Sequence, residues 1–538
     1  MRINILIILC TLLAATATAQ PKYFDISKNI ELFTNTYREL NAYYVDELDP
    51  SKLMKTGLDA MLGSLDPFTN YISEADIESY RYLTEGKYNG IGASFKQRDE
   101  YVIIADLYKD APAQKAGLRI GDRIAGIEGK SAKGKKIEDL DNVLRGYPGT
   151  VINLSILRDG NAAELPIKVM RDEIEISNVP HYEMLNDHIG YLALTTFTKD
   201  AGKHVSKALK ELKEKNQNLK GVAFDLRGNG GGLLNEAIEV CNVFIKDGEL
   251  VVSTKGKVKS LDRSYSTVHE ATDEEIPLVI LIDKSSASAS EIVSGTIQDL
   301  DRGVLVGQRS YGKGLVQNTR DIGYNAKVKL TTSKYYIPSG RCIQSVEYKN
   351  GEPVEIADSL RAQFKTRNGR VVLDGGGVKP DVVLEKSIPG IIKNLSDKYY
   401  IFDYVTQYCA KHDSIAAPEN FHFTQYDDFL AFLNTKKFSY KSDTELLLDS
   451  IRIKANKDNL LGSIAADLQN LQTKIQANTQ NELQQHKSLI IDLIEKEIIS
   501  RYYFQKGKVQ IGLRNDTEIT EAIKILDDPA RYKKLLAK

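Results

Sequence analysis

The sequence predicts a multidomain α/β protein. Its 538 residues are too many for one hydrophobic core, so we expect about three or four domains. Residues 173–385 alternate between buried strands and helices, which is the pattern of an α/β core. A block of short strands and turns precedes this core, and helical patterns occupy both ends of the chain.

Residues 1–19 are predicted to be a signal peptide. Arg2 precedes an apolar run from Ile5 to Leu13, and the small residues "ATA" stand just before Gln20. This layout is typical of a secretory signal cleaved after Ala19, whereas a membrane-spanning helix needs about 20 apolar residues. We therefore expect an exported protein, located in the periplasm or cell envelope, with no integral membrane segment once the signal is removed.

Four regions follow the signal peptide. Residues 20–85 carry apolar side chains at three- and four-residue spacing and are predicted to be helical. Residues 86–172 contain the strand patterns "YVIIADLY" and "VINLSILRDG" and the short helices "APAQKAG" and "IEDLDNVLRG", so we expect a small β-rich domain. In residues 173–385, two buried strands each run into a glycine- or serine-rich loop and then a helix. Residues 386–538 are polar and helical, and we expect a scaffold packed on the core.

The composition argues against several classes of function. The formal net charge of -1 gives no electrostatic footprint for nucleic acid. Cys241, Cys342 and Cys409 lie far apart without Cys-x-x-Cys spacing, which favours neither a disulfide framework nor a zinc site. The seven histidines fall outside the motifs described below, and no His-Glu-x-x-His signature occurs. We therefore expect no metal and no cofactor.

The stretch "VGQRSYGKGL", residues 306–315, allows three interpretations of Lys313. A phosphate-binding P-loop needs Ser or Thr after its lysine, but Gly314 follows here. The spacing Ser310-x-x-Lys313 is that of penicillin-type enzymes, but Gly312 and Gly314 disfavour the helix that this arrangement requires. The third interpretation makes Lys313 the partner of a nucleophile elsewhere in the chain.

Ser288 is the candidate nucleophile. It lies in "SSASASEIV", where an apolar strand ends and a helix begins, so backbone N–H groups beside it can stabilise a developing oxyanion. A structural alternative exists, because Ser288-x-x-Glu291 is also a helix-capping box. A second loop, "DLRGNGGG" at residues 225–232, can expose N–H groups that side chains would block. We expect the loops after these buried strands to meet at one edge of the sheet, where open α/β folds bind ligands.

Five motifs resemble those of the carboxyl-terminal processing peptidases, also called tail-specific proteases. They occur here in the family's order: "DLRGNGGG", "SSASASEI..G..QD", "VGQRSYGKGLVQ", "YYIPSGRCIQ" and "GGGVKPDVVL". The block 86–172 resembles the PDZ domain that precedes the catalytic core in this family. The resemblance covers roughly residues 25–385. It implies an exported serine endopeptidase with an α/β peptidase core of the tail-specific protease type, a PDZ domain, and helical N- and C-terminal regions.

The resemblance also implies roles for individual residues. Ser288 is the expected nucleophile, Lys313 the general base, and Gln317 the residue that orients the lysine amine. Only a neutral amine can accept the serine proton, so the lysine pKa, ordinarily about 10.4, has to be lowered by burial. The expected oxyanion hole combines the Ala289 N–H with one N–H from Gly230 or Gly231. We expect Asp225 and Arg227 to organise the glycine loop rather than to react.

The predicted PDZ domain implies how substrates are recognised. In "YNGIGASF", Gly90, Ile91 and Gly92 are the candidates for binding a peptide carboxylate through backbone N–H groups, and the next strand pairs with the peptide. The expected partners are therefore protein or peptide substrates with free C-termini. An adaptor, or self-association through the helical regions, is also compatible with the sequence.

Two rival functions remain on the sequence alone. The first is a catalytically silent scaffold that binds peptides through the PDZ domain. It is disfavoured because serine, lysine and glutamine all occupy the matching positions. The second is a penicillin-type acyl enzyme, which would have to use Ser310 as its nucleophile.

Overall fold

The computed structural model describes residues 20–161, 163–344, 346–349, 352–385 and 388–537. The predicted signal peptide lies outside these residues. The described chain divides into two compact units. One comprises the N-terminal segment up to residue 73 together with residues 317–331 and 348–353, and the other holds the rest of the chain.

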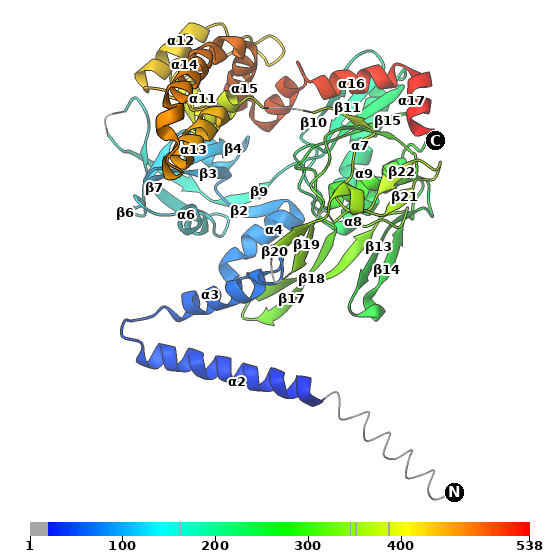
Figure 1. Ribbon diagram of the computed structural model, residues 1–538. Helices are drawn as coiled ribbons and strands as arrows, with labels where there is room; N and C mark the ends of the chain where they lie inside the picture. Colours follow the sequence, from blue (N-terminus) through cyan, green and yellow to red (C-terminus); the bar gives the residue numbers. More distant parts are fainter. Residues whose placement is uncertain (1–19, 162, 345, 350–351, 386–387, 538) are drawn as a thin grey trace, which may run out of the picture. The chain divides into compact units, whose positions relative to one another are not determined.

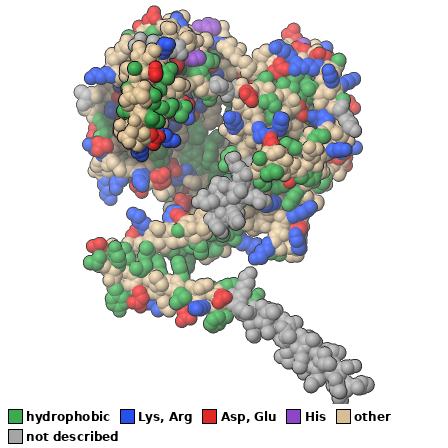
Figure 2. Space-filling model, in the orientation of Figure 1, with side chains coloured by type: hydrophobic (Ala, Val, Ile, Leu, Met, Phe, Trp, Pro, Cys, Tyr) green, Lys and Arg blue, Asp and Glu red, His purple; other side chains and the backbone are tan. Residues whose placement is uncertain are grey.

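The first unit is built from two helices and short strand pairings. Helices α2 (Gln20–Tyr43) and α3 (Pro50–Gly63) lead to strand β1 (Asn70–Ile72). This strand pairs antiparallel with the start of β18 (Ala326–Tyr336), which also pairs with β17 (Leu315–Gly323). Asp49 begins α3 by accepting the N–H of Lys52. Figure 2 shows hydrophobic side chains gathered on the surface of the two helices; Tyr23, Phe24 and Ile30 of α2 are each more than half exposed.

The second unit contains the predicted β-rich block (Figure 1). Its sheet has the strand order β3-β4-β5-β7-β8, with β6 paired to β5. The strands are β3 (Ala93–Arg98), β4 (Tyr101–Leu107), β5 (Arg123–Ile127), β6 (Lys130–Ser131), β7 (Val151–Leu157) and β8 (Leu165–Met170), and the helices are α5 (Pro112–Lys115) and α6 (Ile137–Leu144). The alternating burial along β7 places Ile152, Leu154 and Ile156 in the core of the block. Strands β2 (Lys87–Gly90) and β9 (Asp172–Glu175) pair antiparallel and so bring the two ends of the block together.

The α/β core is a six-stranded sheet. Its strand order is β10-β11-β12-β15-β16-β23, and all neighbours are parallel except β10 and β11. The strands are β10 (His181–Met184), β11 (Ile189–Ala193), β12 (Gly221–Asp225), β15 (Leu278–Ile282), β16 (Val304–Gly307) and β23 (Val382–Val383). Strands β11, β12, β15 and β16 are buried at every residue, as expected for parallel strands covered on both faces.

Helices cover both faces of this sheet. One face packs against α7 (Ala201–Lys215), α8 (Leu234–Phe244) and α9 (Ala289–Asp299). The other face packs against α16 (Thr517–Leu526), through Ile519, Ala522, Ile525 and Leu526, and against α17 (Pro529–Leu536). The last two helices of the chain therefore belong, by packing, to the core. The expected combination of an α/β core, a small β-rich block and helical ends is confirmed.

The remaining elements lie around this core. Residues 388–512 form helices, most of which contribute aromatic or aliphatic side chains to one hydrophobic cluster. These helices are α10 (Gly390–Asp397), α11 (Tyr400–Lys411), α12 (Tyr426–Thr435), α13 (Asp443–Lys457), α14 (Leu461–Gln485) and α15 (Lys487–Gly512). The others are α4 (Ile77–Glu85), β13 (Leu250–Gly256), β14 (Arg263–Ser266), β19 (Val346–Lys349), β20 (Glu352–Glu355), β21 (Gln363–Lys365) and β22 (Val371–Leu373), with 3-10 turns at Glu74–Asp76, Lys259–Leu261 and Asp358–Leu360. No helix of the described residues is long and apolar enough to cross a membrane.

Candidate active site

Three loops meet at the carboxyl edge of the parallel sheet. They follow β12, β15 and β16, and they carry the glycine motif, Ser288 and Lys313 respectively. Backbone hydrogen bonds join neighbouring loops: the Ala287 N–H donates to the Asn229 carbonyl at 3.0 Å, and the Tyr311 N–H donates to the Ser286 carbonyl at 3.0 Å. The structure therefore brings together the segments that the sequence analysis singled out.

Ser288 occupies an unusual backbone conformation directly before α9. Its φ is 55° and its ψ is -113°, a region that residues other than glycine rarely adopt. The conformation turns the chain sharply from the loop into the helix. Ala289 then becomes the first residue of α9, with its N–H at the positive end of the helix dipole.

Glu291 connects the serine loop to the lysine loop. Its buried carboxylate accepts the Ser288 N–H at 2.8 Å, the Lys313 N–H at 2.8 Å and the Gly312 N–H at 2.6 Å, and it also accepts the Ser310 hydroxyl. The Ser288 and Lys313 bonds end on the same oxygen, Oε2. Burial raises the pKa of Glu291 to about 7, because these hydrogen bonds offset only part of the cost of desolvating the charge.

Tyr335 makes a second connection between the same two loops. Its hydroxyl lies 2.7 Å from the Lys313 carbonyl oxygen and 3.1 Å from the Ser288 carbonyl oxygen, and its backbone N–H donates to the Gly314 carbonyl at 3.0 Å. The ring is buried, and burial raises the pKa of this phenol well above its ordinary value, so it stays a hydrogen-bond donor. The backbones of Ser288 and Lys313 are thus fixed to each other from both sides.

These connecting roles have little signal in the sequence. In the sequence, Glu291 belongs to a capping box, and Tyr335 is the first residue of the motif "YYIPSGRCIQ". A capping box predicts the bond from Glu291 to Ser288 but carries no sign of the bonds to residues 310–313. A buried carboxylate bonded to a distant loop is a tertiary feature, so the local pattern could not reveal it.

Two backbone N–H groups beside Ser288 have no acceptor among the described residues. They belong to Ala289 and Gly230. The Gly231 N–H, in contrast, donates to the buried Asn229 side chain at 2.9 Å, and Asn229 is itself held by a 2.8 Å bond to the Leu194 carbonyl. Between the two glycines that the sequence left open, the geometry favours Gly230 as the second oxyanion donor.

Gly231 contributes through close contact instead. Its φ is +100°, and a Cβ atom placed there would lie 2.7 Å from the Ala287 carbonyl oxygen, 2.8 Å from the Ser288 Cβ and 2.9 Å from the Ala289 nitrogen. No side chain fits into this space. The glycine loop can therefore lie directly against the serine loop.

Gln317 and Ser310 have well-defined partners. The Gln317 amide donates to the Thr331 hydroxyl at 3.2 Å within the first unit, and its predicted contact with the lysine amine stays a prediction. The buried Ser310 hydroxyl donates to Glu291 and accepts the Val378 N–H at 2.7 Å. Residues 308–314 are not helical, so Ser310 lacks the arrangement that a penicillin-type nucleophile needs.

The predicted carboxylate-binding loop lies between β2 and β3. Ile91 is 2% exposed, and neither its N–H nor that of Gly92 has an acceptor among the described residues. Their carbonyls, in contrast, accept the N–H groups of Ala113 and Tyr108. Gly92 has a φ of +77° and packs against Ala111, which leaves no room for a side chain. Gly90 is the last residue of β2 and pairs with Asp172.

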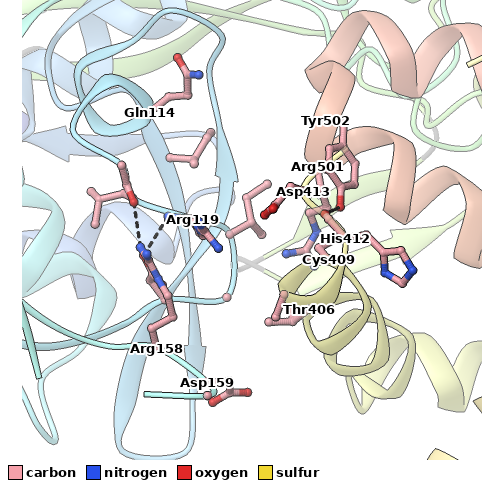
Figure 3. A pocket seen from close by; sticks show the side chains of 18 of the residues that line it. Gln114, Arg119, Arg158, Asp159, Thr406, Cys409, His412, Asp413, Arg501 and Tyr502 are labelled. Carbon is pink, nitrogen blue, oxygen red and sulfur yellow. Dashed lines mark hydrogen bonds and ion pairs between the residues drawn. The ribbon is translucent and has the colours of Figure 1, made fainter. Parts of the chain in front are cut away.

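A cavity of about 570 Å³ lies elsewhere in the second unit (Figure 3). One wall is the β-rich block, with Gln114, Arg119 and Arg158, and the other is formed by α11 and α15, with Thr406 and Tyr502. None of the predicted site residues lines it. Among the described residues, no group of three or more His, Cys, Asp or Glu side chains is arranged to hold a metal ion.

Comparison with known proteins identifies three parts of the chain. Residues 188–350 match peptidase family S41, residues 89–169 match the PDZ domain, and residues 391–526 match the "Probable PDZ-protease, C-terminal helical domain". The carboxy-terminal-processing protease of Bartonella bacilliformis is 34% identical over 365 residues, which are 67% of this chain and 76% of the relative. A "Probable CtpA-like serine protease" of Staphylococcus aureus is 32% identical over 356 residues, which are 65% of this chain and 70% of the relative.

Among solved structures, the photosystem II D1 C-terminal processing protease is 25% identical, with a TM-score of 0.36, over 66% of this chain and 92% of the other. The sequence relatives and the S41 and PDZ matches are sufficient to assign the family, and they agree with the five motifs of the sequence. The chain belongs to peptidase family S41 and is a PDZ-containing serine protease of the carboxy-terminal-processing type.

Proposed function

We propose that this protein cleaves polypeptides with Ser288 as nucleophile and Lys313 as general base. The observation that carries the proposal is the double connection between the two residues, through the Glu291 carboxylate and the Tyr335 hydroxyl. Such a connection fixes the backbones of the nucleophile and its base relative to each other, as proton transfer between the two side chains requires. The N–H groups of Ala289 and Gly230, which have no acceptor in the part of the chain that the structure describes, add a site for the negative charge that develops.

The reaction proceeds in two halves. The neutral Lys313 amine takes the proton from the Ser288 hydroxyl while Oγ attacks the scissile carbonyl carbon. The carbonyl oxygen becomes an oxyanion held by the Ala289 and Gly230 N–H groups. The lysine ammonium then gives its proton to the departing amine, which leaves an acyl-enzyme on Ser288. Water, deprotonated by the same amine, attacks the ester carbonyl; the C–O bond to Ser288 then breaks as the lysine ammonium returns its proton to the serine Oγ, and the carboxylic acid product is released. Gln317 is proposed to orient the amine without adding a charge that would raise its pKa.

The PDZ domain is proposed to recognise the free C-terminus of the substrate. The N–H groups of Ile91 and Gly92, which find no acceptor within the described ranges, suit a terminal carboxylate, and β3 offers an edge for pairing with the peptide. A substrate with an amidated C-terminus should therefore be cleaved more slowly than the free acid. Equal rates for the two would remove the PDZ domain from substrate selection.

Export is a further part of the proposal. It is supported by the signal-peptide pattern of residues 1–19, and an envelope location would give access to exported substrates. The test is the N-terminal sequence of the protein recovered from the producing cell. A mature chain beginning at Gln20 is expected, and a chain retaining residues 1–19 would contradict it.

The main experiment compares cleavage of a loosely folded protein with an apolar C-terminus by the parent, Ser288→Ala and Lys313→Ala. Matched controls come from exposed neighbours in the same loop, Ser285→Ala and Lys284→Ala. The site variants should lose activity and the controls should keep it. Equal activity in all five proteins would refute the dyad. A parent that binds the substrate tail, does not cleave and resists a serine-reactive probe would be a binding scaffold instead.

A further inference from the structure

The C-terminal end of the chain reaches the loop that carries the proposed oxyanion donor. Helix α16 packs on the sheet face through Ile519 and Ala522, and its first turn lies beside Arg227 at the end of β12. Asp516 caps this helix by accepting the N–H groups of Glu518 and Ile519. Residues almost 300 positions apart in sequence thus meet at the edge of the active site.

Arg227 is held by three carboxylates at once. Its Nε donates to Asp225 at 2.9 Å, and its Nη1 donates to Asp516 at 2.6 Å and also to Glu518. The side chain of Arg227 is 15% exposed, that of Asp516 is 11% exposed and that of Glu518 is 1% exposed. Burial alone would lower the pKa of Arg227, but the attraction of these carboxylates outweighs burial and raises it. The guanidinium is therefore a permanently charged anchor.

Hydrogen bonds at Asn229 and Gly231 hold the far part of the loop that follows Arg227: the Asn229 carbonyl accepts the Ala287 N–H and the Gly231 carbonyl accepts the Phe197 N–H, each at 3.0 Å. Residues 228–232 contain four glycines and one buried asparagine, so Asn229 is the one residue of the loop whose side chain can position it. Gly228 donates to the Asp283 carboxylate at 3.0 Å, and Asn229 fixes the next position through its amide. Gly230 itself has open space around it. The direction of its N–H is set by how its neighbours are anchored, and Arg227 is the anchor at the start of the loop.

We infer that Asp516 and Glu518 are positioning residues for catalysis. They hold the Arg227 guanidinium, which fixes the start of the glycine loop and so aims the Gly230 N–H at the developing oxyanion. This inference rests on the proposed function, and it deepens it by making the first turn of α16 a part of the catalytic machinery. It also explains why a polar helix end is buried beside the sheet edge.

The test uses the intact protein with Glu518→Gln and Asp516→Asn. Each change removes a charge and keeps the shape, and asparagine still caps a helix as well as aspartate does. The matched control is Glu521→Gln on the same helix, which breaks the ion pair with Arg531 and does not touch Arg227. For each protein, kcat and KM are measured together with the affinity for a peptide boronic acid, whose adduct with Ser288 places an oxygen in the oxyanion hole. The affinity for the product peptide reports ground-state binding.

Both site variants should lose about tenfold or more in kcat with KM nearly unchanged, since one oxyanion donor is worth about 10²–10³ in rate. Boronate affinity should fall in parallel, while product affinity and the control stay at the parent level. Loss of stability alone would not change the ratio of boronate to product affinity in the folded protein. If Glu518→Gln fails to fold, Asp516→Asn decides.

The inference would be overturned if the parent is active and the two site variants equal Glu521→Gln in kcat and in boronate affinity. The proposed function would then remain intact. A parent that neither cleaves nor forms the Ser288 adduct would overturn both. The two failures are therefore distinguishable.

Discussion

Replacing Gly231 with alanine tests the close contact between the glycine loop and the serine loop. The new Cβ would lie 2.7–2.9 Å from the Ala287 carbonyl oxygen, the Ser288 Cβ and the Ala289 nitrogen. These distances are about 0.5–0.7 Å shorter than the 3.4 Å at which ordinary contact begins. The serine loop must therefore move, and it carries both the nucleophile and an oxyanion donor.

The size of the effect follows from that displacement. Because a 1 Å misplacement can cost about 10²-fold in rate, a shift of about half an ångström predicts a loss of about tenfold or more in kcat. Overpacking adds about 1–3 kcal/mol of destabilisation, and the left-handed backbone adds about 1–2 kcal/mol for a residue with a Cβ.

The matched control is Gly228→Ala in the same loop. Gly228 also has a positive φ, +69°, but a Cβ there would meet nothing within 4 Å. It should show only the backbone cost, about 1–2 kcal/mol, and keep most of the activity. Steady-state cleavage and thermal melting of the two variants separate the effect of the steric contact, which only Gly231→Ala has, from the effect of backbone strain, which both variants share. If Gly231→Ala cleaves as fast as Gly228→Ala, the loops do not depend on this contact and the reasoning is wrong.

Three other changes have defined outcomes. Burial raises the pKa of Glu291 to about 7, so the ionised carboxylate that holds both loops is lost as pH falls through about 7, and kcat should fall with it. The variant Glu291→Gln cannot titrate and should not show this decrease of kcat at acid pH. An unchanged decrease in the variant would assign it to another group. The same raised pKa lowers the free energy of unfolding by roughly 3 kcal/mol as pH rises from about 4.5 to about 7, so melting temperature and activity should have opposite pH trends there. Arg341 and Asp299 form a buried ion pair with 2.9 Å between the charged atoms. Arg341→Ala should lower the free energy of unfolding by about 3–5 kcal/mol, because the buried carboxylate loses its counter-charge. The double variant Arg341→Met with Asp299→Leu should recover most of this free energy in a denaturation assay. Gly92→Ala should weaken the binding of a tail peptide measured by calorimetry, because no side chain fits at this position. The control Gly117→Ala should bind as the parent does, because Gly117 also has a positive φ but a Cβ there would meet nothing within 4 Å. Equal affinities of the two variants would contradict the assignment of the carboxylate-binding loop.

Much of the fold could be predicted because local patterns and core positions agree. The buried runs "GVAFD" and "LVILI" became β12 and β15, and the loops after them meet at the sheet edge as the strand polarity requires. The short helices predicted in the β-rich block also formed, as α5 and α6. In each case the sequence signal lies within one element, and tertiary packing does not oppose it.

The rest depended on contacts between distant segments. Gly230 can be preferred to Gly231 as the oxyanion donor only once it is known that the Gly231 N–H already donates to the Asn229 side chain. The association of α16 with the sheet could not be read from a polar helical pattern, because its apolar face looks the same whichever surface it covers. The break in α15 at Phe504, whose φ is 55° and ψ is -152°, lies inside a continuous helical pattern without proline.

The pairing of β2 with β9 places the entry and the exit of the PDZ domain side by side. The segment between them leaves and rejoins the chain at paired residues, Gly90 and Asp172, whose Cα atoms in an antiparallel ladder are about 5 Å apart. A change of length inside the PDZ domain therefore leaves the chain entering and leaving at the same two-stranded stem, so the register of the catalytic sheet does not depend on it. Insertions or deletions in the loops of the recognition domain can thus alter the peptide groove without moving the strands that carry the catalytic loops.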